Sequence, residues 1–191
     1  MAPLFVIYLI WIAWVVSWWA AALWSNPAVK RAGGKREFLY RVLAVAGAFL
    51  LFGFYSNRYD MMYRFWQTPS GVFGWSMAGL VLIGFAFSWW ARVYLGPLWS
   101  SSVTRKHAHH VVDTGPYALV RHPIYTGITL ATFATALVAA TPTSFLGAAI
   151  MTAGWVVKAR LEERFLREEL GAEAYDAYSR RVPMLVPFWP L

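Results

Sequence analysis

The sequence predicts an all-α integral membrane protein with five transmembrane helices. Of its 191 residues, 59% are hydrophobic and only 14% are charged, whereas soluble domains are about 45–50% apolar and about a quarter charged. The positive charges behind the net charge of +8 lie between long uncharged runs and form no basic stripe, so no nucleic-acid partner is expected. Cysteine is absent, which excludes disulfides and thiol nucleophiles.

Three apolar runs predict the first three spans. Residues 4–24 carry no charge, are long enough to cross a bilayer and lack the basic start of a secretory signal, so we expect a retained span. Residues 42–57 are slightly short but are flanked by arginines that can reach the interface. Residues 71–91 end in two tryptophans, which favour the membrane interface.

The last apolar run, residues 123–157, is too long for one helix. The sequence Thr141-Pro142-Thr143-Ser144 interrupts it, because proline removes a helical donor and Thr or Ser favours a turn or an N-cap. We therefore predict a tight hairpin of a fourth and a fifth span. The fifth helix is expected to continue as a charged helix over residues 158–170, which Gly171 ends.

The distribution of lysine and arginine predicts the orientation. Fifteen of these residues follow the first, third and fifth spans, and only Arg58 and Arg64 fall on the opposite face. We expect a protein of the inner or plasma membrane of the cell. Because cytoplasmic loops are rich in Lys and Arg, its amino terminus is expected on the side away from the cytoplasm. The loop before the fourth span and the carboxy-terminal segment would then both be cytoplasmic.

The segment that enters the fourth span carries polar groups suited to an anion. Arg121 and His122 precede Pro123, which is typical of a first helical position, so both lie at the positive end of the helix dipole. Tyr117 and Tyr125 add aromatic faces. A juxtamembrane arginine that holds an anionic lipid headgroup is the simpler alternative. No metal is expected, because the nearby histidines 107, 109 and 110 lack the spacing of common zinc motifs.

The charged helix places Glu162 and Glu163 just beyond the fifth span, at the expected depth of Arg121 and His122. Pairs four residues apart, such as Lys158 and Glu162, explain most of these charges as an ordinary ion-pair face. Two carboxylates so close to hydrocarbon are expensive unless they serve a cation. This placement favours a positively charged or amino-bearing ligand.

These motifs resemble the isoprenylcysteine carboxyl methyltransferase and phospholipid methyltransferase superfamily. The resemblance rests on Gly-x-Tyr-x-x-x-Arg-His-Pro-x-Tyr-x-Gly over residues 115–127, the helical hairpin, and the later motifs Arg160-x-Glu162-Glu163 and Tyr175-x-x-Tyr178. It covers roughly the carboxy-terminal half. Residues 1–95 are accordingly expected to hold three generic spans, and residues 96–191 the methyltransferase region.

The resemblance implies an enzyme that uses S-adenosylmethionine and a lipophilic acceptor from the bilayer. Its pocket would face the cytosol, between the loop before the fourth span and the carboxy-terminal helix and tail. The cofactor-binding residues it implies are His109, Gly115, Tyr117, Arg121, His122, Tyr125, Glu162 and Glu163.

The catalytic candidates are Arg121, His122 and Glu163, and their roles depend on the acceptor. A carboxylate acceptor is nucleophilic as it stands and Arg121 could orient it, whereas an amine or a thiol would need His122 or Glu163 as a base. A sterol-type reductase that binds NADPH and a non-enzymatic lipid-binding module are the alternatives. Membrane lipids and a prenylated or other lipophilic small molecule are the expected partners, and the oligomeric state stays open.

Overall fold

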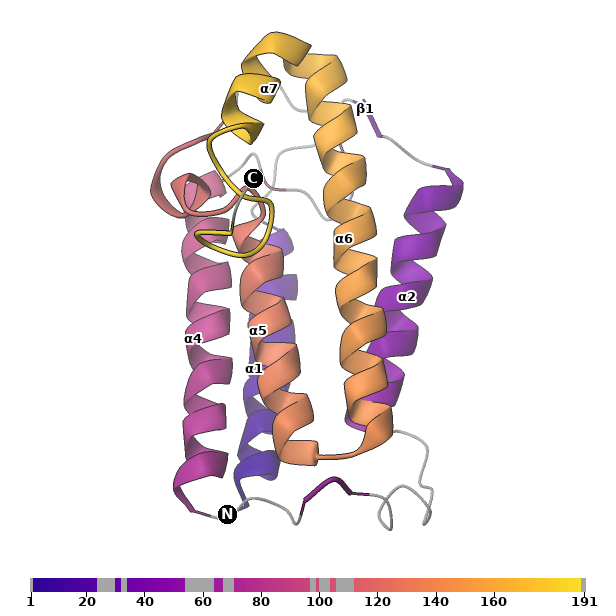
Figure 1. The fold of residues 1–191 in the computed structure, drawn as a ribbon, viewed down its shortest axis with the longest axis vertical. Coiled ribbons are helices and arrows are strands. Elements are labelled where there is room, and N and C mark those ends of the chain that lie inside the picture. Colours follow the sequence, from indigo (N-terminus) through magenta and orange to yellow (C-terminus); the bar gives the residue numbers. More distant parts are fainter. Residues whose placement is uncertain are drawn as a thin grey trace.

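The computed structural model describes residues 2–23, 30–31, 34–53, 64–66, 71–96, 99, 104–105 and 112–189. Within these ranges the regular secondary structure is helical apart from one pair of two-residue strands. Five long helices run side by side and a short one closes the end of the bundle (Figure 1). The helices are α1 (Pro3–Ala22), α2 (Lys35–Phe52), α4 (Val72–Leu95), α5 (Pro123–Ala139), α6 (Pro142–Leu170) and α7 (Ala172–Ser179).

Two of the described helices, α1 and α4, are long and apolar enough to cross a membrane. Helix α5 is equally apolar in character but has 17 residues, and α2 and α6 carry charged residues toward one end. The bundle thus contains a helix for each predicted span. The number of helices that cross a membrane remains a prediction.

Two predicted boundaries differ from the structure. Helix α2 begins at Lys35 and stops before Gly53, which adopts a left-handed conformation with φ 64°, as glycine does without steric cost. Residues 54–57 of the predicted second span lie outside the described residues. Helix α4 extends four residues past the predicted end because Arg92 is buried and donates to the carbonyl oxygens of Ala21 and Gly96. Arg92 thereby satisfies carbonyls at the ends of α1 and α4.

The predicted hairpin is present. Thr141 is the N-cap of α6, and its Oγ1 accepts a hydrogen bond of 3.1 Å from the backbone N–H of Ser144. The Ser144 hydroxyl in turn accepts from the Thr141 N–H, which completes a reciprocal capping box. Helix α6 then runs without a break to Leu170, so the charged stretch continues the fifth helix as expected.

Glycine brings α4 and α5 into backbone contact. A Cβ atom on Gly84 would collide with the backbone carbonyl of Gly127, and one on Gly127 would collide with that of Gly84. The buried Ser88 hydroxyl also joins the helices, since it donates to the Ile124 carbonyl oxygen at 3.0 Å. Helix α1 packs on this pair through Trp11, whose indole N–H donates to Thr135.

A second glycine contact joins α2 and α6. A Cβ atom on Gly47 would lie 2.6 Å from the Met151 nitrogen and 2.7 Å from the Gly147 oxygen. Larger side chains separate the two tight pairs, because α5 meets α6 through the stacked rings of Tyr125 and Trp155. The bundle therefore has two close-packed halves with an aromatic seam between them.

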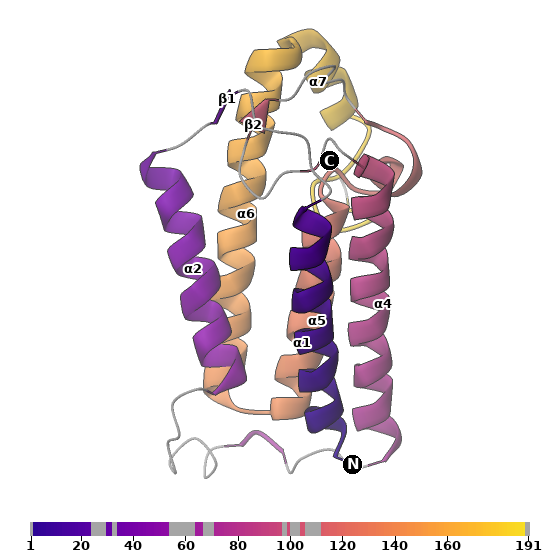
Figure 2. The same cartoon turned by 180° about the vertical axis from the view of Figure 1, so that it is seen from behind.

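The basic segments gather at one end of the bundle. Strands β1 (Lys30–Arg31) and β2 (Thr104–Arg105) pair in antiparallel fashion and connect the segments that follow α1 and α4 (Figure 2). The amino terminus lies at the opposite end, where residues 64–66 contact the hairpin through a bond from Phe65 to Ala140. Successive connecting segments thus lie at alternate ends of the bundle, as the predicted order of spans requires. That the basic end faces the cytoplasm stays a prediction.

Candidate functional site

Five of the predicted site residues form one partly buried network between the start of α5 and the charged half of α6. The Arg121 Nε donates to Glu163 Oε1 at 2.8 Å, and the His122 Nε2 lies 3.1 Å from the same oxygen. The Tyr125 hydroxyl donates to Glu162 Oε1 at 2.6 Å. The two carboxylates expected to serve a cation are therefore bonded to side chains from the start of α5.

His122 bridges the two glutamates. Its Nδ1 lies 3.5 Å from Glu162 Oε2 while its Nε2 faces Glu163, and its side chain is only 7% exposed. Only the doubly protonated imidazolium can donate to both carboxylates. Burial lowers the pKa of His122, but the hydrogen bonds to Glu162 and Glu163 raise it by more, so the pKa lies above its ordinary value.

The same contacts act on the carboxylates in the opposite direction. Burial raises the pKa of Glu162 and of Glu163, but the hydrogen bond to His122 is the first of several contacts that lower it by more. Both pKa values therefore lie below the ordinary value for glutamate. The raised pKa of His122 and the lowered pKa values of the two glutamates favour an imidazolium held between two ionised carboxylates.

These shifts predict a stability maximum in mildly acidic solution. The contribution of His122 is complete below its unfolded pKa of 6.5 and is lost as the pH rises through the higher folded value. The contribution of the glutamates is complete above their unfolded pKa of 4.5 and is lost as the pH falls through the lower folded value. Thermal unfolding in detergent should therefore show the highest midpoint between about pH 4.5 and about pH 6.5.

The variant His122→Gln isolates this effect from the other titrating groups. Its midpoint should lose the decline that the unmodified protein shows above about pH 6.5. Identical pH profiles for the two proteins would contradict the bridging imidazolium.

The carboxy-terminal segment, residues 182–189, lies over the start of α5. The Arg121 guanidinium donates to the carbonyl oxygens of Ser179 and Val182, at 2.9 and 2.6 Å. The backbone N–H groups of Arg121 and His122 donate to the carbonyls of Pro183 and Met184. The donors that the sequence analysis assigned to an anion thus bind the protein's own carbonyls in this structure.

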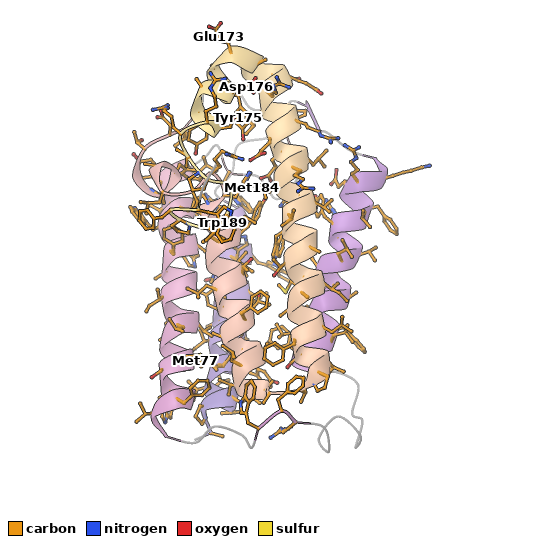
Figure 3. The ribbon with its side chains drawn as sticks, viewed as in Figure 1. Met77, Glu173, Tyr175, Asp176, Met184 and Trp189 are labelled. Atoms are coloured by element: carbon orange, nitrogen blue, oxygen red, sulfur yellow. The ribbon has the colours of Figure 1, made fainter. Side chains whose placement is uncertain are left out.

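A pocket of about 530 Å³ lies beside this junction. Arg121 contributes the charged side chain of the pocket wall, and Met184 and Trp189 lie near the upper end of α5 (Figure 3). The lining residues are Arg121, Ser179, Pro183, Met184, Leu185, Val186 and Trp189. This volume falls in the range of small-molecule sites, about 300–1,000 Å³.

Gly115 and Tyr117, also predicted at the site, make their contacts outside the network. Gly115 has φ 58° and starts a 3₁₀ helix, η2 (Gly115–Ala118), where a Cβ atom would come within 2.6 Å of the Tyr94 ring. Tyr117 is buried, and its carbonyl accepts a hydrogen bond of 2.7 Å from Tyr178 on α7. These two residues hold the loop against α4 and α7. His109 and its neighbouring histidines lie outside the described residues.

Sequence reasoning missed three side chains at the network. The Lys158 ammonium is 4.0 Å from Glu162 Oε1 and 5.4 Å from the ring centroids of Tyr40 and Tyr125. Trp155 stacks on Tyr125 at 5.4 Å. The four-residue spacing of Lys158 and Glu162 was a visible signal, but it resembles an exposed ion pair. No motif marks Tyr40, because only the packing of α2 on α6 brings it here.

A sequence profile of the isoprenylcysteine carboxyl methyltransferase family matches residues 77–168, just under half of the chain. The predicted resemblance to this family is confirmed. The family segment contains all five residues of the carboxylate network, together with Trp155 and Lys158. Tyr40 and the carboxy-terminal segment lie outside it.

Three curated relatives are methyltransferases by name. Methanethiol S-methyltransferase 2 of Bradyrhizobium diazoefficiens is 48% identical over 71 residues, which cover 37% of this chain and 26% of the relative. Methanethiol S-methyltransferase of a Pseudomonas species is 42% identical over 71 residues, again 37% of this chain and 26% of the relative. Protein-S-isoprenylcysteine O-methyltransferase B of Arabidopsis thaliana is 32% identical over 89 residues, 45% of this chain and 44% of the relative. The matched regions thus span less than half the length of each relative.

Proposed function

We propose that this protein transfers the methyl group of S-adenosylmethionine to a lipophilic acceptor in the membrane. The observation that carries the proposal is the partly buried network of Arg121, His122 and Tyr125 with Glu162 and Glu163. It lies inside the segment that matches a methyltransferase family, and the relatives that share this segment carry methyltransferase names.

The residues present fit S-adenosylmethionine, which carries an amino group, a carboxylate, a sulfonium and a ribose diol. Glu162 and Glu163 offer carboxylate oxygens to the amino group or the diol, and Arg121 offers a guanidinium to the carboxylate. The buried indole N–H of Trp155 has no hydrogen-bond partner among the described residues. A buried donor of this kind is expensive to leave unpaired and would suit a polar atom of a ligand.

The bound cofactor supplies an already activated methyl group, so the protein has to align the acceptor and exclude water. The Arg121 guanidinium is fixed by Glu163 and by two carbonyls, which suits it to orient a carboxylate acceptor. For an amine or thiol acceptor, the ionised Glu163 carboxylate is the group that can accept the proton, because both His122 nitrogens face carboxylates in the doubly protonated form. The carboxy-terminal segment covers the start of α5 and limits the access of water.

The apolar surface of the bundle supports a membrane location. Large apolar side chains on α1 and α4 are exposed, among them Ile12, Trp19, Val72 and Ile83, and in a bilayer they would face lipid. We place the network at the cytoplasmic end of the bundle, where most lysines and arginines gather. A lipophilic acceptor could then reach the site from within the bilayer, whether it is a carboxylate, an amine or a thiol.

Calorimetry of the purified protein in detergent tests the proposal. S-adenosylhomocysteine, the product form of the cofactor, should release or absorb heat with a saturable isotherm, and NADPH should not. Heat with NADPH alone would favour a reductase. The absence of binding for both compounds would exclude the enzymatic proposals and favour a lipid-binding module.

A further inference from the structure

We propose that Lys158 occupies an internal cation site formed by Tyr40, Tyr125 and Glu162, and that the sulfonium of S-adenosylmethionine takes this site when the Lys158 side chain leaves it. The inference rests on the proposed function and extends it to α2, which contributes Tyr40 from outside the family segment. Lys158 would thus be a positioning residue that responds to the charge of the ligand.

The surroundings of the Lys158 ammonium are those of a cation site. Its side chain is 9% exposed, and the Tyr40 and Tyr125 rings each lie 5.4 Å from Nζ. Aromatic faces attract cations within about 6 Å, and such cages recognise quaternary ammonium groups. Glu162 adds a carboxylate oxygen at 4.0 Å. Every one of these groups would attract the positive sulfur of S-adenosylmethionine in the same way.

Packing holds the walls of this site. The Tyr125 ring stacks with the His122 ring, at 5.6 Å, and with the Trp155 ring, at 5.4 Å. Tyr40 is 4% exposed, and its helix approaches α6 at Gly154, where a Cβ atom would lie 3.2 Å from the Tyr40 carbonyl. The lysine is the flexible member, since its four-carbon stem allows the ammonium to reach solvent while the stem stays packed.

Two cations cannot share the site, so the charge on sulfur decides which one occupies it. The sulfonium competes with the Lys158 ammonium, whereas the neutral thioether of S-adenosylhomocysteine does not. In methyl transfer the acceptor atom would form a bond to the methyl carbon with its own electron pair. The bond between that carbon and sulfur would break, and its electron pair would stay on sulfur, which would become neutral. Lys158 can then return, and its return would favour release of the product.

The test compares a cationic and a neutral ligand. Sinefungin carries an ammonium in place of the methyl sulfonium, and S-adenosylhomocysteine carries a neutral sulfur. Calorimetry should show that Lys158→Met increases the preference for sinefungin over S-adenosylhomocysteine by at least about 10-fold, because the competing cation is gone. Lys158→Arg should leave the preference within about 2-fold of the original. The control Lys35→Met, at an exposed position on α2, should change neither affinity.

A second measurement uses the unaltered protein and does not depend on how the variants fold. Acylation by acetic anhydride, followed by mass spectrometry, should label Lys158 slowly in the free protein and faster with sinefungin, but not with S-adenosylhomocysteine. Lys35 serves as the exposed reference. Protection of Lys158 by both ligands, or an unchanged preference in Lys158→Met, would overturn the inference. Failure of the unaltered protein to bind either ligand would instead overturn the proposed function.

Discussion

Replacing Glu163 with Gln should weaken S-adenosylhomocysteine binding by at least about 30-fold, because it removes a partly buried charge that holds Arg121 and His122. The substitution keeps the size of the side chain but leaves the buried His122 and the partly buried Arg121 without that carboxylate. We also expect a loss of about 1.5–3 kcal/mol in the free energy of unfolding, since the pair is only partly buried. Calorimetry measures the first effect, and denaturant unfolding followed by circular dichroism measures the second.

Glu168→Gln is the matched control. Glu168 lies on the same helix but is exposed, so its replacement should change stability by less than about 0.5 kcal/mol and leave binding intact. Equal affinities for the Glu163 and Glu168 variants would show that the cofactor does not use the network. Equal stabilities would show that the ion pairs contribute nothing to the fold.

Replacing Gly84 with Ala should destabilise the protein by about 3 kcal/mol. The added Cβ atom would collide with the Gly127 carbonyl and would lie 3.2 Å from the Ala131 nitrogen. Backbone atoms cannot rotate away as a side chain can, so α4 and α5 would have to separate. Because Arg121 and His122 directly precede α5, the separation should also weaken ligand binding.

Gly79→Ala is the matched control, because it also replaces a glycine of α4 with alanine but at a position that has no close contact with another helix. Gly79 lies on the same helix, and a Cβ atom there would meet nothing within 4 Å. Alanine also has the higher helix propensity, by about 1 kcal/mol, so this variant should be as stable as the parent or more so. Thermal unfolding of both variants in one detergent separates them, and equal midpoints would contradict the glycine contact.

Local rules were enough to predict most of the helices and part of the network. Thr141 and Pro142 mark the hairpin, because capping and the missing proline donor act within one turn. A hairpin also brings the start of its first helix near the end of its second. The sequence therefore placed Arg121 and His122 at the same depth as Glu162 and Glu163, and the structure joins these residues directly.

Partners from distant segments could not be predicted in this way. The carbonyl oxygens of Pro183 and Met184 accept hydrogen bonds from the backbone N–H groups of Arg121 and His122. From the sequence alone, these N–H groups are expected to bind an anion. Nothing in residues 182–189 indicates this contact, because a backbone carbonyl is the same in every residue. The end of α4 was predicted too early for a similar reason. The Arg92 guanidinium donates to the carbonyl oxygen of Ala21 on α1, which is 71 positions away in the sequence.

An apolar helical chain, its hairpin, the clustering of basic residues after alternate helices and the residue types of a methyltransferase-like site can all be read from the sequence. These features depend on composition and on interactions within a few residues. Only the folded protein shows that His122 bridges two carboxylates, that the carbonyls of Pro183 and Met184 accept from the N–H groups of Arg121 and His122, and that Tyr40 reaches Lys158. Each of these contacts depends on how the helices pack, and side-chain packing between distant segments has no counterpart in a local sequence pattern.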